Sequence, residues 1–192
     1  MPTNSWSWEH DAMNTALARR VARLEQHFRQ IVEERMRGVP LLHPGLTVQA
    51  LGFELHAPTP DEGEGAPAWA SGVLITPWFM NLLRLPLVAL TPMQAVERGW
   101  LASGHSGRRE LGGQHFEFLG ASEGDAQVGE LGAFECCSLF SPMFEFADHA
   151  AAVATGAEVL RVLRTPAPTP EPVPARRGFL FGRSAVSAEG RR

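Results

Sequence analysis

The chain has 192 residues, a length that suits one domain with a tail. Its net charge of −4 argues against the basic surface that nucleic-acid binding requires, so no nucleic acid is expected as a partner. Cys136 and Cys137 are the only cysteines, which excludes a disulfide framework and indicates a reducing compartment. The first 30 residues contain no continuous apolar core, so no signal peptide is expected and the protein is predicted to be cytoplasmic.

Residues 9–37 are predicted to form an amphipathic helix. Its apolar side chains recur at spacings of three and four, which places them on one face. They are Met13, Leu17, Val21, Leu24, Phe28, Ile31 and Val32. The charged residues of the segment, Arg19, Arg20 and Arg23 among them, are predicted to form a solvated face. Gly38 ends the helix.

Two strands are predicted after this helix. In residues 48–56, Leu51, Phe53 and Leu55 alternate with residues that would face solvent, which is the period of a half-buried strand. A second strand at 69–76 follows a polar loop rich in glycine and proline. We expect the two strands to pair in the antiparallel sense.

The second strand opens the most apolar part of the chain, Gly72–Pro86, with the sequence GVLITPWFMNLLRLP. It is too short and too interrupted by proline to cross a bilayer, so no direct membrane insertion is expected. Pro77 has no N–H to donate and should end the strand pairing. The bulky residues Trp78, Phe79 and Met80 are therefore expected at a strand end.

The middle of the chain contains weaker signals. Residues 85–100 are ambiguous. A short helix is one interpretation, and Pro86 and Pro92 would limit its length. Residues 104–109 are predicted to form a loop. Strands are predicted at 111–119 and 129–139, with a turn at 121–127 between them.

Ser141 and Pro142 are predicted to open the last helix, because serine caps free N–H groups and proline is tolerated at the first helical position. Glu145 and Asp148 would lie in its early turns, and Pro166 would end it. The order of elements predicts an α+β fold, a two-layer sandwich in which a mostly antiparallel sheet of four or five strands is packed by an N-terminal and a C-terminal helix.

A tail is predicted beyond this domain. Proline at every second position in Thr165–Ala175 is typical of an extended polyproline spacer. We therefore divide the chain into a domain at 1–164 and a Pro-rich linker with a disordered, Arg-rich tail at 165–192.

No catalytic motif is present, because the sequence contains no CxxC, HExxH, GxSxG or glycine-rich phosphate loop. An enzyme is therefore not expected, and neither is a cofactor or a metal of its own. Cys137 is expected to be a small buried apolar residue. The alternative is a metal- or cluster-handling role for Cys136, Cys137 and the scattered histidines.

Aromatic residues gather in two motifs at the ends of predicted elements. They are Trp78, Phe79, Phe140, Phe144 and Phe146. Exposed aromatic and methionine surface is one way in which proteins bind an apolar peptide, and burial between sheet and helix is the other interpretation. Both hold if the rings line the wall of a groove.

The motifs ITPWFMNLLRLP and CSLFSPMFEFAD, the second at Cys137–Asp148, lie about sixty residues apart. Together they resemble the signature of the HybE/HupJ/HoxT family, the assembly chaperones of membrane-bound nickel–iron hydrogenases. The resemblance extends over roughly Trp8 to Leu163.

This resemblance implies a cytoplasmic chaperone without enzymatic activity. Its partner would be the hydrogenase small-subunit precursor, whose twin-arginine signal peptide it would bind to delay export until the cofactors are assembled. The large subunit and other maturation factors are further partners, and an accessory protein that handles metal or iron–sulfur clusters is the alternative function. The peptide-binding residues would be Pro77, Trp78, Phe79, Met80, Asn81, Phe140, Phe144, Glu145, Phe146 and Asp148. Glu145 and Asp148 would meet the paired arginines in charge-assisted contacts.

The predicted tail contains a sequence that resembles the twin-arginine signal itself. Arg176, Arg177, Phe179 and Leu180 lie in the sequence RRGFL, which resembles the R-R-x-F-L core of a twin-arginine signal. One hypothesis is a pseudo-substrate that occupies the peptide groove until a precursor displaces it. The other is a solvated tail with a chance match.

Overall fold

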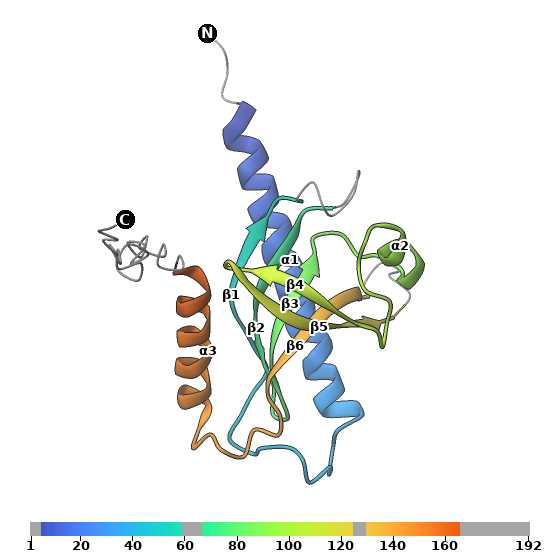
Figure 1. The fold of residues 1–192 in the computed structure, drawn as a ribbon. Coiled ribbons are helices and arrows are strands. Elements are labelled where there is room, and N and C mark those ends of the chain that lie inside the picture. Colours follow the sequence, from blue (N-terminus) through green and yellow to red (C-terminus); the bar gives the residue numbers. More distant parts are fainter. Residues whose placement is uncertain (1–4, 59–66, 125–129, 166–192) are drawn as a thin grey trace, which may run out of the picture.

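The computed structural model describes residues 5–58, 67–124 and 130–165, with side chains from residue 11 onward. Three helices and six strands follow one another along the chain (Figure 1). They are α1 (Ser5–Glu34), β1 (Gln49–His56), β2 (Trp69–Ile75), β3 (Met80–Pro86), α2 (Pro92–Glu97), β4 (Ser106–Leu111), β5 (Gln114–Glu123), β6 (Gly132–Phe140) and α3 (His149–Arg164). The strands form one antiparallel sheet in the order β1-β2-β3-β6-β5-β4.

The long helices α1 and α3 pack on opposite faces of this sheet. Consecutive residues of β2, which point to opposite faces, show this arrangement. Val73 belongs to the same buried cluster as Leu160 of α3. The next residue, Leu74, belongs to the cluster that contains Leu24 and Phe28 of α1. The α+β class is confirmed, but the sheet has six strands rather than four or five, and each face carries its own helix.

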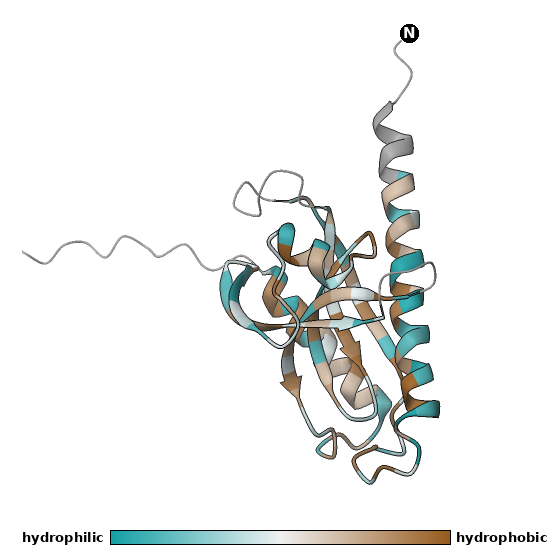
Figure 2. Cartoon of the chain, turned by 90° about the vertical axis from the view of Figure 1, so that its right-hand side faces the viewer, coloured by the Kyte–Doolittle hydropathy of each residue, from teal (hydrophilic) through white to brown (hydrophobic). Residues whose placement is uncertain are grey.

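Helix α1 runs along its face of the sheet, and its N-terminal turns extend beyond the sheet edge (Figures 1 and 2). The predicted apolar stripe is buried in its second half, at Leu24, Phe28 and Ile31, whereas Met13 in the first half is 38% exposed. The solvated face predicted for the charged residues is wrong at Arg20, which is buried.

Strand β1 departs from the predicted alternation. A bulge between Leu51 and Glu54 inserts an extra residue, and the backbone of Gly52 there has a φ of 58°. As a result, Leu51 packs in the α3 cluster while Phe53 packs in the α1 cluster. The strand itself was predicted, but the prediction of one common face for these residues is wrong.

Two strands were not predicted. The apolar stretch at 72–86 folds as a hairpin, in which β3 follows β2 after a short turn and pairs with it along its whole length. Residues 104–109 were predicted as a loop, yet 106–111 form β4. Its exposed residues, Ser106, Arg108 and Glu110, alternate with less exposed ones, which suits an edge strand. Strand β5 also continues to Glu123, into the predicted turn.

The last helix begins at His149 and not at Ser141, so the predicted start is wrong. Asp148 is the N-cap, and its Oδ1 accepts a hydrogen bond from the N–H of Ala151 at 2.8 Å. Glu145 consequently lies in the loop before the helix. The short helix α2 is confirmed, and Thr91 and Gln94 form a capping box at its start.

The proposed tail residues 166–192 lie outside the described residues. Within the part that is described, no helix is long and apolar enough to cross a membrane.

Candidate partner-binding site

The two sequence motifs meet at one end of the sheet. Met80, at the start of β3, pairs with Phe140, at the end of β6. The turn before β3 therefore lies beside the loop after β6, and the Ser141 hydroxyl donates to the carbonyl of Trp78 at 3.4 Å. We call residues 76–81 and 138–148 the motif end.

Thr76 organises the turn between β2 and β3. Its Oγ1 accepts hydrogen bonds from the N–H groups of Trp78 and Phe79, at 3.3 and 3.0 Å. The Phe79 carbonyl in turn accepts from the N–H of Thr76 at 2.8 Å. The carbonyl of Pro77 accepts from the N–H of His43 at 2.8 Å, which attaches the segment after α1 to the turn. The role of Thr76 was missed, although a threonine followed by proline is a turn signal.

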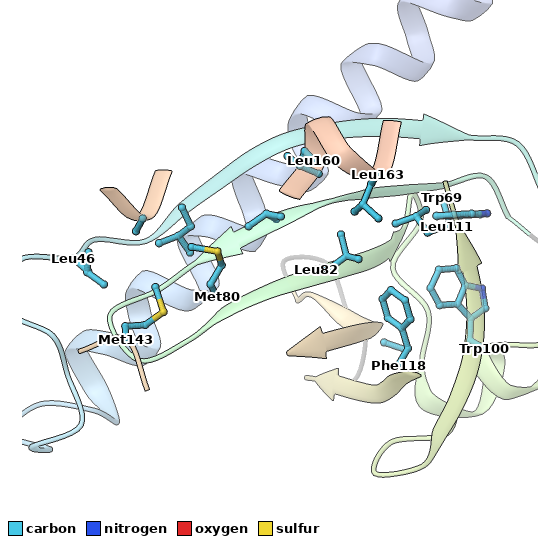
Figure 3. Packing of buried hydrophobic residues seen from close by; sticks show 14 of the residues in the cluster. Leu46, Trp69, Met80, Leu82, Trp100, Leu111, Phe118, Met143, Leu160 and Leu163 are labelled. Carbon is cyan, nitrogen blue, oxygen red and sulfur yellow. The ribbon is translucent and has the colours of Figure 1, made fainter. Parts of the chain in front are cut away.

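Several predicted binding residues belong to the core. Met80 has no exposed surface, and Phe146 is 7% exposed with its ring edge-on to Phe140 at 5.1 Å. Met80 lies with Met143 and Leu46 at one end of the core (Figure 3). The core interpretation therefore holds for Met80 and Phe146.

Trp78 and Phe79 lie on the other face of the sheet. Both are half-buried, with ring centroids 6.3 and 5.6 Å from that of Phe28 in α1. Asn81 is also half-buried, and its side-chain oxygen accepts no hydrogen bond from the residues that the structure describes. The rings of Trp78 and Phe79 therefore pack against α1 and are only partly exposed to solvent.

Most exposed residues of the motif end lie in the loop before α3. Phe144 is 54% exposed, and its ring centroid is 6.4 Å from that of His43. Glu145 and Asp148 are exposed beside it, and Leu41, two residues before His43, is 38% exposed. We call these five residues the Phe144 patch; it combines apolar surface with two carboxylates.

The two cysteines are free thiols on opposite faces of β6. Burial, followed by the proximity of Cys137 and of Glu135, raises the pKa of Cys136 to about 11. Burial and then Glu117 raise the pKa of Cys137. Over residues 5–58, 67–124 and 130–165, no three His, Cys, Asp or Glu side chains come together as metal ligands.

A second polar arrangement lies at the other end of the sheet and was missed. Glu135 has no exposed surface, yet its carboxylate binds Arg84 at 2.5 Å and Arg109 at 2.6 Å. The guanidinium of Arg84 stands over the rings of Trp69 and Trp100, 4.2 and 5.0 Å from their centroids. Both tryptophans lie in this part of the core in Figure 3. The signal in the sequence was Arg84 itself, an arginine within an apolar run.

Next to this arrangement, the sheet borders an open cavity of about 800 Å³. Residues of both edge strands line it, His56 from the end of β1 and Arg108 from β4, so the sheet is strongly curled. The cavity floor includes Arg84 and Trp69, which are already packed against each other.

The model of the family described as "[NiFe]-hydrogenase assembly, chaperone, HybE" matches residues 19–182. The chain belongs to the HybE family. Protein HoxT of Cupriavidus necator is 43% identical over 175 residues, which cover 88% of this chain and 92% of HoxT. Hydrogenase expression/formation protein HupJ of Bradyrhizobium diazoefficiens is 35% identical over 164 residues, 81% of this chain and 83% of HupJ.

A solved structure is similar as well. The solution structure of HybE from Escherichia coli superimposes with a TM-score of 0.49 at 20% identity, and the match covers 87% of this chain and 91% of HybE. The family model and the relatives confirm the family resemblance seen in the two motifs, and both motifs lie within the residues that the model matches. The assignment of individual binding residues stays a prediction.

Proposed function

We propose that this HybE-family chain is a cytoplasmic, non-enzymatic chaperone that binds the small-subunit precursor of a membrane-bound nickel–iron hydrogenase. It would hold the twin-arginine signal peptide of that precursor and delay export until the cofactors are in place. The large subunit and other maturation factors would join the same assembly. The observation that carries the proposal is the Phe144 patch, an exposed apolar and acidic surface to which the second family motif contributes Phe144, Glu145 and Asp148.

The chemistry of the patch suits such a peptide. A twin-arginine signal presents two guanidinium groups next to an apolar segment. Phe144 offers an exposed ring to the apolar part, and the Glu145 carboxylate lies on the neighbouring residue. Carboxylates bind arginine forks in charge-assisted, bidentate hydrogen bonds.

The two carboxylates are not equivalent. One oxygen of Asp148 already accepts the hydrogen bond that caps α3. Glu145 has no part in the helix cap, because it lies three residues earlier. We therefore assign the principal arginine contact to Glu145 and a supporting contact to Asp148. Trp78, Phe79 and Asn81 would extend the binding surface along the turn between β2 and β3, Phe140 would extend it at the end of β6, and Met80 and Phe146 would support it from the core.

The same proposal divides the chain into a chaperone domain at 1–164 and a tail at 165–192. The RRGFL segment of the tail, with Arg176, Arg177, Phe179 and Leu180, would act as a pseudo-substrate for the patch. A tethered segment acts at an effective concentration of roughly millimolar, so even weak binding would compete with a precursor.

The cysteines give no support to the alternative of cluster handling. A thiolate is the form that binds metal, and the raised pKa of Cys136 keeps it protonated at neutral pH. The two side chains also face opposite sides of the sheet.

Calorimetric titration of a twin-arginine signal peptide tests the proposal. We expect binding to the full chain, and at least tenfold weaker binding to Phe144→Ala and to Glu145→Gln. Leu119→Ala is the matched control, because Leu119 is 44% exposed on β5, outside the motif end. Equal binding to all variants, or no binding to either the full chain or residues 1–164, would overturn the assignment.

The tail has its own measurement in the same experiment. Tighter binding of the peptide to residues 1–164 than to the full chain would support the pseudo-substrate. Equal affinity for both forms would remove the tail from the mechanism and leave the chaperone proposal intact.

A further inference from the structure

A second cavity, of about 510 Å³, lies between α1 and the segments that follow β3 and precede β6. Its walls include Arg19, Arg20 and Arg23 from α1, Leu87 after β3 and Glu130 before β6. The α1 residues that line it lie between Ala16 and Gln26, in the middle of the helix. None of the motif-end residues lines it, so it is separate from the Phe144 patch.

The base of this cavity carries a buried positive charge. Arg20 is only 6% exposed. Its Nε donates to the carbonyl of Pro86 at 2.9 Å, and its Nη2 donates to the carbonyl of Leu131 at 2.5 Å. Both partners are neutral carbonyls. Burial and then Arg23 lower the pKa of Arg20 to about 10, which is the effect expected of a cation without a nearby anion.

Two more arginines surround this charge. Arg19 and Arg23 are one helical turn apart, and neither forms an ion pair with a described residue. Like charges at this spacing repel each other and destabilise a helix. By contrast, Arg29 of α1 binds Glu25 at 2.7 Å, and Arg35, just after the helix, binds Glu123 at 3.3 Å.

We propose that the cavity is a binding site for an oxyanion, either a carboxylate or a phosphate group. Arg19 and Arg23 would hold it with their planar forks, and Arg20 would supply the buried charge beneath it. Against these three arginines the described lining contains a single carboxylate, that of Glu130, so the site has a net positive charge. Leu87 and the alanines of the lining would contact the apolar part of the ligand.

Such a group has two sources, a small free anion or an acidic side chain of a bound polypeptide. Calorimetric titrations at constant ionic strength distinguish them, with sodium citrate, sodium phosphate and an end-blocked tetraglutamate peptide as the probes. The protein is the full chain, compared with Arg19→Gln/Arg23→Gln. Arg37→Gln/Arg161→Gln is the control, which removes the same charge from two exposed positions outside the cavity.

We expect at least one probe to bind the full chain and the control, and to bind Arg19→Gln/Arg23→Gln at least tenfold more weakly. Binding of citrate or phosphate would identify a free oxyanion, and binding of the peptide alone would identify a polypeptide carboxylate. Absence of binding by every probe, or equal weakening in the two double variants, would overturn the proposal. If Arg19→Gln/Arg23→Gln does not fold, the exposed single variant Arg19→Gln gives the same comparison.

Discussion

Nη1 of Arg84 donates a hydrogen bond to Oε2 of Glu135, and both side chains are buried, with 4% and 0% of their surface exposed. The same carboxylate also accepts from Arg109 of β4 and from the N–H of Leu101. A single buried carboxylate of β6 therefore connects the neighbouring strand β3 with the edge strand β4, which β5 separates from β6.

Replacing Glu135 by glutamine should be strongly destabilising. The variant leaves the buried guanidinium of Arg84 without its anion, and breaking a buried pair from one side costs about 3–5 kcal/mol. Urea unfolding followed by circular dichroism measures the loss. Glu158→Gln removes an exposed carboxylate that pairs with Arg161 on α3, and we expect it to leave the unfolding midpoint unchanged. Similar midpoints for the two variants would show that the buried network contributes no stability.

The pairing of Arg84 with Glu135 could not be predicted from the sequence, although much of the fold could. The local patterns identified both long helices, the α+β class and the two motifs, because amphipathic periodicity and proline or glycine signals act over a few residues. The pairing of Arg84 with Glu135 depends on β3 and β6 being neighbours, over 51 residues of chain. No local sequence pattern predicts which strands are neighbours or the register in which they pair.

The candidate site shows the same division. The motifs identified the correct end of the sheet, since Met80 and Phe140 are paired there. They did not separate exposed Phe144 from buried Phe146, because the loop that contains both has no regular period. The helix start was misplaced for a related reason. Ser141 and Asp148 are both good caps by residue type, and only the path of the loop after β6 decides between them.

The glycine pair in the turn from β4 to β5 predicts a measurable contrast. Both residues have positive φ, 61° at Gly112 and 73° at Gly113. A Cβ on Gly112 would lie 1.9 Å from the carbonyl oxygen of Leu163 in α3, whereas a Cβ on Gly113 meets nothing within 4 Å. Gly113→Ala should cost about 1–2 kcal/mol of backbone strain alone.

Gly112→Ala has the same strain and must also separate the turn from α3. We expect at least about 1–3 kcal/mol of further destabilisation from this overpacking. Thermal unfolding of the two variants, compared with the unmodified chain, gives the difference. Equal midpoints would mean that the end of α3 moves away from the turn at no cost.

The two phenylalanines that precede α3 should respond in opposite ways to truncation. Phe146 is buried against Phe140, so Phe146→Ala should destabilise the chain by about 3–5 kcal/mol. Phe144 is 54% exposed, so Phe144→Ala should lower stability by less than about 1 kcal/mol. Chemical denaturation checks both values. A large loss in Phe144→Ala would identify this side chain as part of the core, and its effect on peptide binding would then have a structural cause.

The rate of alkylation by iodoacetamide measures the fraction of each cysteine that is present as thiolate. The pKa of Cys136 is raised from its ordinary value of 9.0 to about 11, so at pH 8 the fraction present as thiolate is about a hundredfold lower than for a free cysteine. Cys137→Ser leaves this thiol alone and removes the contribution of Cys137 to its pKa, but burial, the largest cause, still raises the pKa. In this variant we expect a slow reaction that accelerates as the pH rises. Cys136→Ser reports Cys137, whose pKa is raised by burial and by Glu117.

The same variants in urea provide the control, because unfolding exposes the thiol and restores the ordinary pKa. If folded Cys137→Ser reacts at pH 8 as fast as the unfolded chain, Cys136 is a reactive thiolate, and the cluster-handling alternative regains its chemical basis.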